Sequence, residues 1–295
     1  MGRGGAPVSR PAPTGSAARR PTRYFLRWAA AAAPVHLGAE VDMTRVAAHR
    51  AAARARGRRY AYVTYLLHAA ARVVAAHPEA RAVATGLLRP RTVPLPGPGV
   101  SAKLALDTPA EDGTRTVRTV VLPGLESLPL DGVQDLVDRY RRAAPGELPG
   151  ARAVRALCVL PPPLGELAFR LGMRGPAARE RRMGTFAVSS LGHRAVDVFH
   201  AYGGAAVTFC AARVVQRPLV RGGRVRAAPV LRLSLTFDHR VLDGAAAADV
   251  LDGVVTRLEG WHGDLPGPRD GRAASGALRP PGADEGAEGT VGSGP

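Results

Sequence analysis

Twelve residues near the C-terminus, 233–244, read LSLTFDHRVLDG and decide the fold. Apolar and polar residues alternate up to Phe237, which predicts a strand with one apolar face. A run with helical periodicity follows from Ala245 to Glu259, and Asp243 and Gly244 stand where its N-terminal cap is expected. His239 thus lies between a strand end and a helix start. The sheet would hold its backbone there while the imidazole, which titrates near neutral pH, stays accessible as a general base.

This pattern alone leaves two interpretations open. Asp243 could serve only as a helix cap and His239 only as a packed residue at the end of a strand. Alternatively, the histidine is a base and the aspartate its partner.

A second informative stretch, residues 184–192, reads GTFAVSSLG. By itself it predicts a strand over residues 185–188 followed by a turn, which is a common pattern.

Together, these two stretches resemble the catalytic domain of the acyltransferase (E2) subunits of 2-oxo acid dehydrogenase complexes. The related chloramphenicol acetyltransferases and condensation domains share only a sparser His-x-x-x-Asp-Gly, usually with a second histidine where this chain has Asp238. Residues 34–44 (PVHLGAEVDMT) resemble the family's first strand and helix, and 105–109 (ALDTP) its central strand. The resemblance covers about residues 24–260.

The resemblance implies a role for each matching residue. His239 would take the proton from an attacking thiol, and Ser189 would donate its hydroxyl to the oxyanion. Asp243 would orient and balance charge in the site, or cap the helix, or both. Ser190 is a neighbour without an assigned role, and Arg240 is expected to pair with a nearby carboxylate. The thiol attacks the thioester directly, so no covalent enzyme intermediate is expected.

The resemblance further implies acyl-coenzyme A as substrate and a homotrimer, or a multiple of it, in which His239 and Ser189 meet across a subunit interface. Lys103 is the only lysine, and it lies within the catalytic region. We therefore expect no lipoyl group on this chain. Three possibilities are open: transfer to a separate carrier protein or small acceptor, service in a complex whose lipoyl domains another chain supplies, or a scaffold with little catalysis.

The order of predicted elements indicates an α/β domain, a two-layer sandwich of mixed β-sheet and helices with the chloramphenicol acetyltransferase-like fold. We expect a disordered basic arm over 1–22, the catalytic domain over 23–262 and a disordered tail over 263–295. The Pro- and Arg-rich stretch 160–183 predicts a surface excursion with one short helix, Leu164 to Leu171. The other predicted elements are a strand from Pro34, helices ending near Arg56, Ala76 and Ala143, and strands over 103–109 and 117–122.

The formal net charge of +17 is almost entirely arginine. Solvated faces and a basic arm explain it most simply, while the phosphates of coenzyme A or an acidic carrier protein are the more specific partners. Few aromatic residues accompany the arginines, so we expect no nucleic-acid partner. We also expect no membrane span and a cytoplasmic protein.

The two cysteines, Cys158 and Cys210, stand in apolar, strand-like runs and are expected to be buried and reduced. Neither belongs to a metal-binding pattern, so no metal site is expected. A nucleophilic cysteine, Cys210 with His200 or His193, finds no support in the spacing. The remaining histidines are expected to pack or lie on the surface, with His36 and His193 as candidates to line a substrate channel.

Overall fold

A computed structural model describes residues 17–86, 91–109 and 115–263. Its centre is a six-stranded sheet in the order β1-β8-β7-β6-β4-β5. Strand β6 runs parallel to both of its neighbours, and the other pairs are antiparallel. This arrangement confirms the predicted mixed sheet. The strands are β1 (Pro34–Asp42), β4 (Ala102–Pro109), β5 (Arg115–Leu122), β6 (Phe186–Ser190), β7 (Val207–Arg221) and β8 (Arg224–Asp238).

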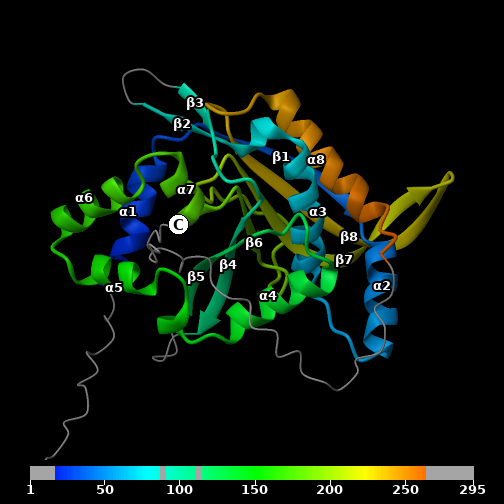
Figure 1. Cartoon of the computed structure of the whole chain (residues 1–295). Coiled ribbons are helices and arrows are strands. Elements are labelled where there is room, and N and C mark those ends of the chain that lie inside the picture. Colours follow the sequence, from blue (N-terminus) through cyan, green and yellow to red (C-terminus); the bar gives the residue numbers. More distant parts are fainter. Residues whose placement is uncertain (1–16, 87–90, 110–114, 264–295) are drawn as a thin grey trace, which may run out of the picture.

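Helices cover one face of this sheet, as Figure 1 shows. Their apolar sides and the apolar side chains of β8, from Leu231 to Phe237, form a single core. The sequence predicted the bounds of each of these four helices to within about two residues. They are α2 (Thr44–Ala55), α3 (Tyr62–Ala76), α4 (Leu130–Arg142) and α8 (Gly244–Glu259). The chain therefore has the predicted two-layer α/β architecture.

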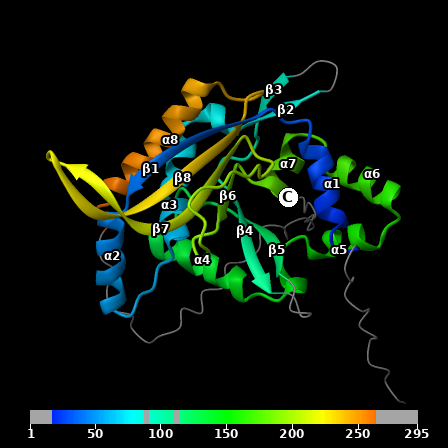
Figure 2. The same ribbon diagram turned by 180° about the vertical axis from the view of Figure 1, so that it is seen from behind.

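The opposite face of the sheet carries the polar residues of β8, and Figure 2 turns it toward the viewer. Alternation predicts that these side chains point away from the core, which they do. Ser234, Thr236 and Asp238 are nevertheless buried, because a loop crosses this face. That loop is tied down where Gly203 N–H donates to Thr208 Oγ1 and where Lys103 Nζ donates to the Gly203 carbonyl.

The Pro- and Arg-rich stretch differs from its prediction. The predicted short helix is present as α6 (Pro162–Gly172), but the stretch also contains α7 (Pro176–Met183), and α5 (Ala151–Val159) directly precedes it. The prolines stand in the first turns of α6 and α7, where the missing N–H has no helical partner to lose. Cys158 accordingly lies in a helix rather than a strand-like run. Both cysteines are buried and free, as predicted.

A further helix, α1 (Arg20–Ala29), packs on α5 and α6. The predicted disordered arm over 1–22 is wrong at its end, because α1 begins at Arg20; residues 1–16 lie outside the described part. Arg20 donates to the carbonyls of Cys158 and Leu160, which close the end of α5. Tyr24 is buried against Gly165, where a Cβ would lie 2.6 Å from the tyrosine oxygen. This close approach requires glycine.

Two smaller features complete the fold. Strands β2 (Ala82–Thr85) and β3 (Arg91–Pro94), which the sequence reading did not identify, form a separate two-stranded sheet. The distal part of the β7–β8 hairpin extends past the end of β1, which pairs with β8 only as far as Val230.

In the described ranges, none of the helices has the length and apolar character needed to cross a membrane. The predicted tail lies outside the described residues except for Gly263.

Candidate active site

His239 lies immediately after β8, in the connection to α8. Its backbone N–H donates to the carbonyl of Ala33 at 2.9 Å, which fastens the residue to the chain just before β1. Its side chain is 47% exposed, and its ring centroid lies 5.5 Å from that of Phe237. The sheet thus fixes the backbone of the histidine while the imidazole remains open to solvent.

Asp243 occupies the N-cap position of α8, but its side chain makes no capping hydrogen bond. Its Oδ1 instead lies 3.8 Å from Nδ1 of His239. This separation is too long for a hydrogen bond but short enough for an ion pair once the imidazole is protonated. Asp243 therefore occupies the predicted cap position without forming a capping bond, and its carboxylate faces the histidine.

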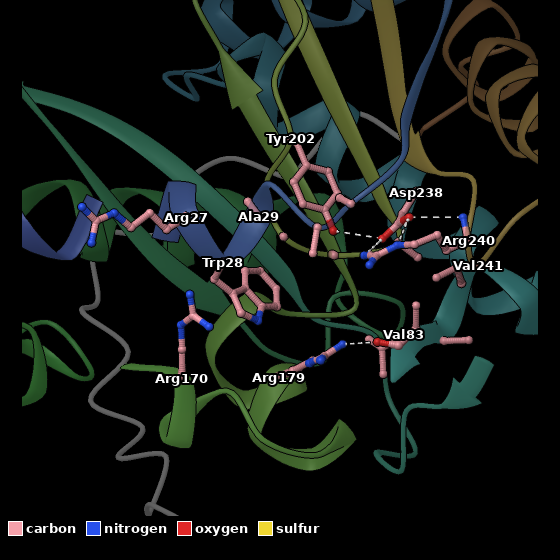
Figure 3. Close-up of a pocket in the computed structure, with 17 residues that line it drawn as sticks. Arg27, Trp28, Ala29, Val83, Arg170, Arg179, Tyr202, Asp238, Arg240 and Val241 are labelled. Carbon is pink, nitrogen blue, oxygen red and sulfur yellow. Dashed lines mark hydrogen bonds and ion pairs between the residues drawn. The ribbon is translucent and has the colours of Figure 1, made fainter. Parts of the chain in front are cut away.

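Asp238 and Arg240 form the bidentate ion pair that holds this connection, as Figure 3 shows. Arg240 Nη2 donates to Asp238 Oδ2 at 2.6 Å and Nε donates to Oδ1 at 2.9 Å. The hydroxyl of Tyr202 donates to the same carboxylate at 3.3 Å. This confirms the expected carboxylate partner of Arg240.

Burial by itself would raise the pKa of Asp238. The hydrogen bonds from the Arg240 side chain and from the N–H groups of Ala33 and Arg240 outweigh it, so the pKa lies below its ordinary value. The carboxylate stays ionised and anchors both residues next to His239. Asp238 was not named as this partner from the sequence, because Arg240 lies after the end of β8, in a turn that folds it back onto the aspartate.

Ser189 lies in β6, flanked by Ala105 of β4 and Cys210 of β7. Its side chain is half-buried on the polar face of the sheet, opposite to Phe186 and Val188, whereas that of Ser190, also half-buried, points to the helix-covered face. The strand follows Gly184, which has φ of +69°, and a Cβ there would lie 2.9 Å from backbone atoms of Ser101 and Lys103. The glycine of the GTF stretch is thus required for β6 to lie against β4.

Within one chain, Ser189 and His239 do not meet. In the sheet, Ser189 pairs with Cys210 of β7, and Cys210 pairs with Ser234 of β8. Ser234 precedes His239 by five residues. Two strand spacings across the sheet and five residues along it place the two about 15–20 Å apart. A site that contains both side chains therefore needs a second copy of the chain.

The other histidines and the cysteines have different surroundings. Burial lowers the pKa of His68 to about 4, and its ring packs on Trp261. His36 stacks on His200 and contacts Thr236, on the same face as Ser189. Burial raises the pKa of Cys210 to about 11, and its Sγ contacts the Ala201 carbonyl. A neutral, buried thiol is a poor nucleophile, which argues against Cys210 as a catalytic cysteine.

Parts of this sequence match known proteins. Residues 174–263 match the family model of the 2-oxoacid dehydrogenases acyltransferase catalytic domain. Over 40 residues the chain is 52% identical to the dihydrolipoyllysine-residue acetyltransferase component of the pyruvate dehydrogenase complex of Bacillus subtilis. That alignment spans 14% of this chain and 9% of the relative.

Solved structures are similar over most of the chain. A probable dihydrolipoamide acetyltransferase from Listeria monocytogenes aligns with a TM-score of 0.62 and 15% identity, covering 88% of this chain and all of that one. A dihydrolipoamide acetyltransferase from Azotobacter vinelandii aligns with a TM-score of 0.57 and 21% identity, covering 81% and 86%. The described domain thus has the fold of these acyltransferase cores, and its residues 174–263 are similar to the 2-oxoacid dehydrogenases acyltransferase catalytic domain.

Proposed function

We propose that this protein is a coenzyme A-dependent acyltransferase in which His239 is the general base and Ser189 donates a hydrogen bond to the oxyanion. The observation that carries the proposal is the placement of His239, with its backbone held by the sheet and Nδ1 facing Asp243. The catalytic mechanism studied in the Azotobacter vinelandii protein involves a serine, a histidine and an asparagine, the last two four residues apart. His239 and Asp243 have the same spacing.

The reaction proposed is a direct transfer between two thiols. Nε2 of His239 accepts the proton of the attacking thiol, and the sulfur forms a bond to the thioester carbonyl carbon. The carbonyl oxygen becomes an oxyanion that accepts a hydrogen bond from the Ser189 hydroxyl. When the carbon–sulfur bond to the leaving group breaks, its thiolate takes the proton back from His239. Free thiols titrate near 8.5, so a base is needed at neutral pH.

Asp243 would assist by stabilising the imidazolium that forms in this cycle. Its carboxylate is 92% exposed, so water and salt screen the attraction. We therefore assign it a supporting role, weaker than that of a buried carboxylate.

The donor proposed is acyl-coenzyme A, and the acceptor is a dihydrolipoyl thiol or another small thiol. Lys103, the only lysine in the sequence, is buried in β4. The acceptor group would therefore be carried by another molecule. A homotrimer, or a multiple of it, would supply the second chain that the separation of Ser189 from His239 requires.

The test is a panel of acyl-coenzyme A thioesters, assayed for release of free thiol with and without dihydrolipoamide. His239→Ala should lower turnover about 10²–10⁴-fold. The matched control is His262→Ala, since His262 is exposed beyond α8. Turnover by His239→Ala equal to that of the wild type would refute the base assignment.

The alternative function, a scaffold with little catalysis, makes a different prediction. A monomer would leave Ser189 and His239 apart, and its acyl transfer should not depend on either residue. Light scattering together with the thioester assay separates the two functions.

A further inference from the structure

A cavity of about 250 Å³ lies between helices α1, α6 and α7 and the end of β8. Figure 3 shows its arrangement, with Trp28 and Arg179 on one side and Asp238, Arg240 and Tyr202 on the other. Its remaining wall is formed by small apolar residues, among them Val83 and Val241. The cavity is thus lined by both guanidinium groups and apolar surface.

Arg179 forms no direct ion pair with a carboxylate of the described residues, although Asp238 stabilises its charge at longer range. Its Nη1 donates to the Ala84 carbonyl at 2.5 Å and its Nε donates to the Met173 carbonyl at 3.2 Å. Its guanidinium also lies 5.4 Å from the centre of the Trp28 ring. These direct contacts of Arg179 are all with neutral groups. Burial lowers the pKa of Arg179, so a bound anion would favour its charged form.

Two more arginines stand at the outer end of the cavity. Arg27 and Arg170 both line it, and both donate to Glu166, at 2.5 Å and 2.9 Å. Their side chains are 66% and 59% exposed, so each can turn toward a ligand at little cost. Four arginines therefore surround the cavity against the two carboxylates of Glu166 and Asp238, which leaves a net charge of +2.

This cavity is separate from the proposed catalytic histidine. Asp238 and Arg240 point into it, whereas the ring of His239 packs near Phe237, a residue of the helix-covered core. His239 itself is not part of the lining.

From these observations we propose that the cavity is a binding site for a small phosphate-bearing molecule. Arg179 and Arg170 contact the phosphate, and Trp28 covers the apolar part of the ligand. A phosphate dianion matches the net charge, and guanidinium groups bind phosphate through paired hydrogen bonds. The proposal does not depend on acyl transfer, because binding can be measured without turnover.

Isothermal titration calorimetry of the full chain with phenyl phosphate tests the site. Saturable one-to-one binding is expected, with phenol, the uncharged counterpart, binding at least about tenfold more weakly. Absence of saturable phenyl phosphate binding at low salt would overturn the proposal.

Variants locate the site. Arg179→Gln should weaken binding at least about tenfold, and Arg179→Lys, which keeps the charge, by less. Because Arg179 also holds two carbonyls, Arg170→Glu on the exposed rim provides an independent test, with an expected loss of about fivefold or more. Arg141→Gln, an exposed change on α4, is the matched control. Wild-type affinity in both Arg170→Glu and Arg179→Gln would overturn the assignment.

Competition identifies the source of the phosphate. If coenzyme A displaces phenyl phosphate and dephospho-coenzyme A does not, the 3′-phosphate of the acyl donor occupies the cavity. If neither displaces it while the variants lose affinity as expected, the ligand is a separate phosphorylated metabolite. Either result supports a phosphate site. Loss of acyl transfer in His239→Ala with unchanged phenyl phosphate binding would show that the two sites act independently.

Discussion

Nδ1 of His239 lies 3.8 Å from Oδ1 of Asp243, while the N-cap hydrogen bond that Asp243 could form at the start of α8 is not made. A residue placed at a cap by the backbone is thus directed toward the proposed base. If Asp243 only caps α8, its substitution should lower stability. If it supports His239, its substitution should lower turnover instead.

Asp243→Ala should leave the protein nearly as stable as the wild type, because no capping bond is lost, although a cap is ordinarily worth about 1 kcal/mol. Acyl transfer should fall about two- to tenfold, and less at high salt, because the carboxylate is exposed. Thermal unfolding and turnover check the two effects. Asp249→Ala, an exposed change on the same helix, is the control. A large loss of stability with unchanged turnover would show that Asp243 is only a cap.

Asp238→Asn should destabilise the protein by about 2–4 kcal/mol, since Arg240 loses its ion-pair partner at a largely buried position. The pKa of Asp238 is lowered in the folded protein, so its contribution to stability is present above about pH 4 and is lost as the pH falls through the folded value. The variant should therefore lose less stability than the wild type between pH 5 and 3. Denaturant unfolding across this range measures the difference, and parallel curves would contradict it.

Lys103 predicts a second rise of stability with pH, in the alkaline range. Burial lowers its pKa to about 8, and in the described part of the chain its Nζ contacts Met183 Sδ, the Gly203 carbonyl and the Phe25 ring, all of them neutral. The buried charge costs stability below pH 8, and this cost disappears as the pH rises toward the unfolded value. Relative to Lys103→Met, the wild type should gain about 2–3 kcal/mol of stability between pH 7 and 10.5. Equal pH dependence of the two proteins would show that the amine is not buried in the charged form.

Neither cysteine should react with a thiol reagent in the native protein at pH 8. Burial raises the pKa of both Cys158 and Cys210, so little thiolate is present and access is blocked. Unfolding in denaturant should expose both thiols. Rapid labelling of Cys210 in the folded protein would reopen the nucleophilic-cysteine alternative.

The sequence predicted the elements whose signals are local. The alternation before His239 gave β8 and its apolar face, and the run after Asp243 gave α8 to within one residue. Helix α6 was predicted in part, over Leu164 to Leu171, but α7 was missed because proline usually ends helices, whereas here Pro176 occupies a first turn. Helix α5 was missed because the residues around Cys158 form an apolar run that resembles a strand. Helix α1 was missed for a different reason: Tyr24 is held by contact with Gly165, about 140 residues away in the chain, which no local pattern records.

The candidate site was predictable to a similar degree. Motif resemblance picked out His239, Asp243 and Ser189. The carboxylate partner of Arg240 was not identified from the sequence, because Arg240 reaches Asp238 through the turn that follows β8. The separation of Ser189 from His239 depends on sheet order, which local patterns do not specify. Tyr202 and Arg179 reach the end of β8 from a loop and an inserted helix, so their positions required the tertiary structure.

The central claim is that the active site forms between two chains, and subunit complementation tests it most directly. His239→Ala and Ser189→Ala chains, co-expressed with different tags and purified as mixed oligomers, should each be nearly inactive alone. Each mixed trimer pairs an intact His239 with an intact Ser189 at one of its interfaces, so mixed trimers should recover roughly a third of wild-type activity. Mixed oligomers no more active than the separate variants, or a wild-type monomer that transfers acyl groups at full rate, would contradict the account.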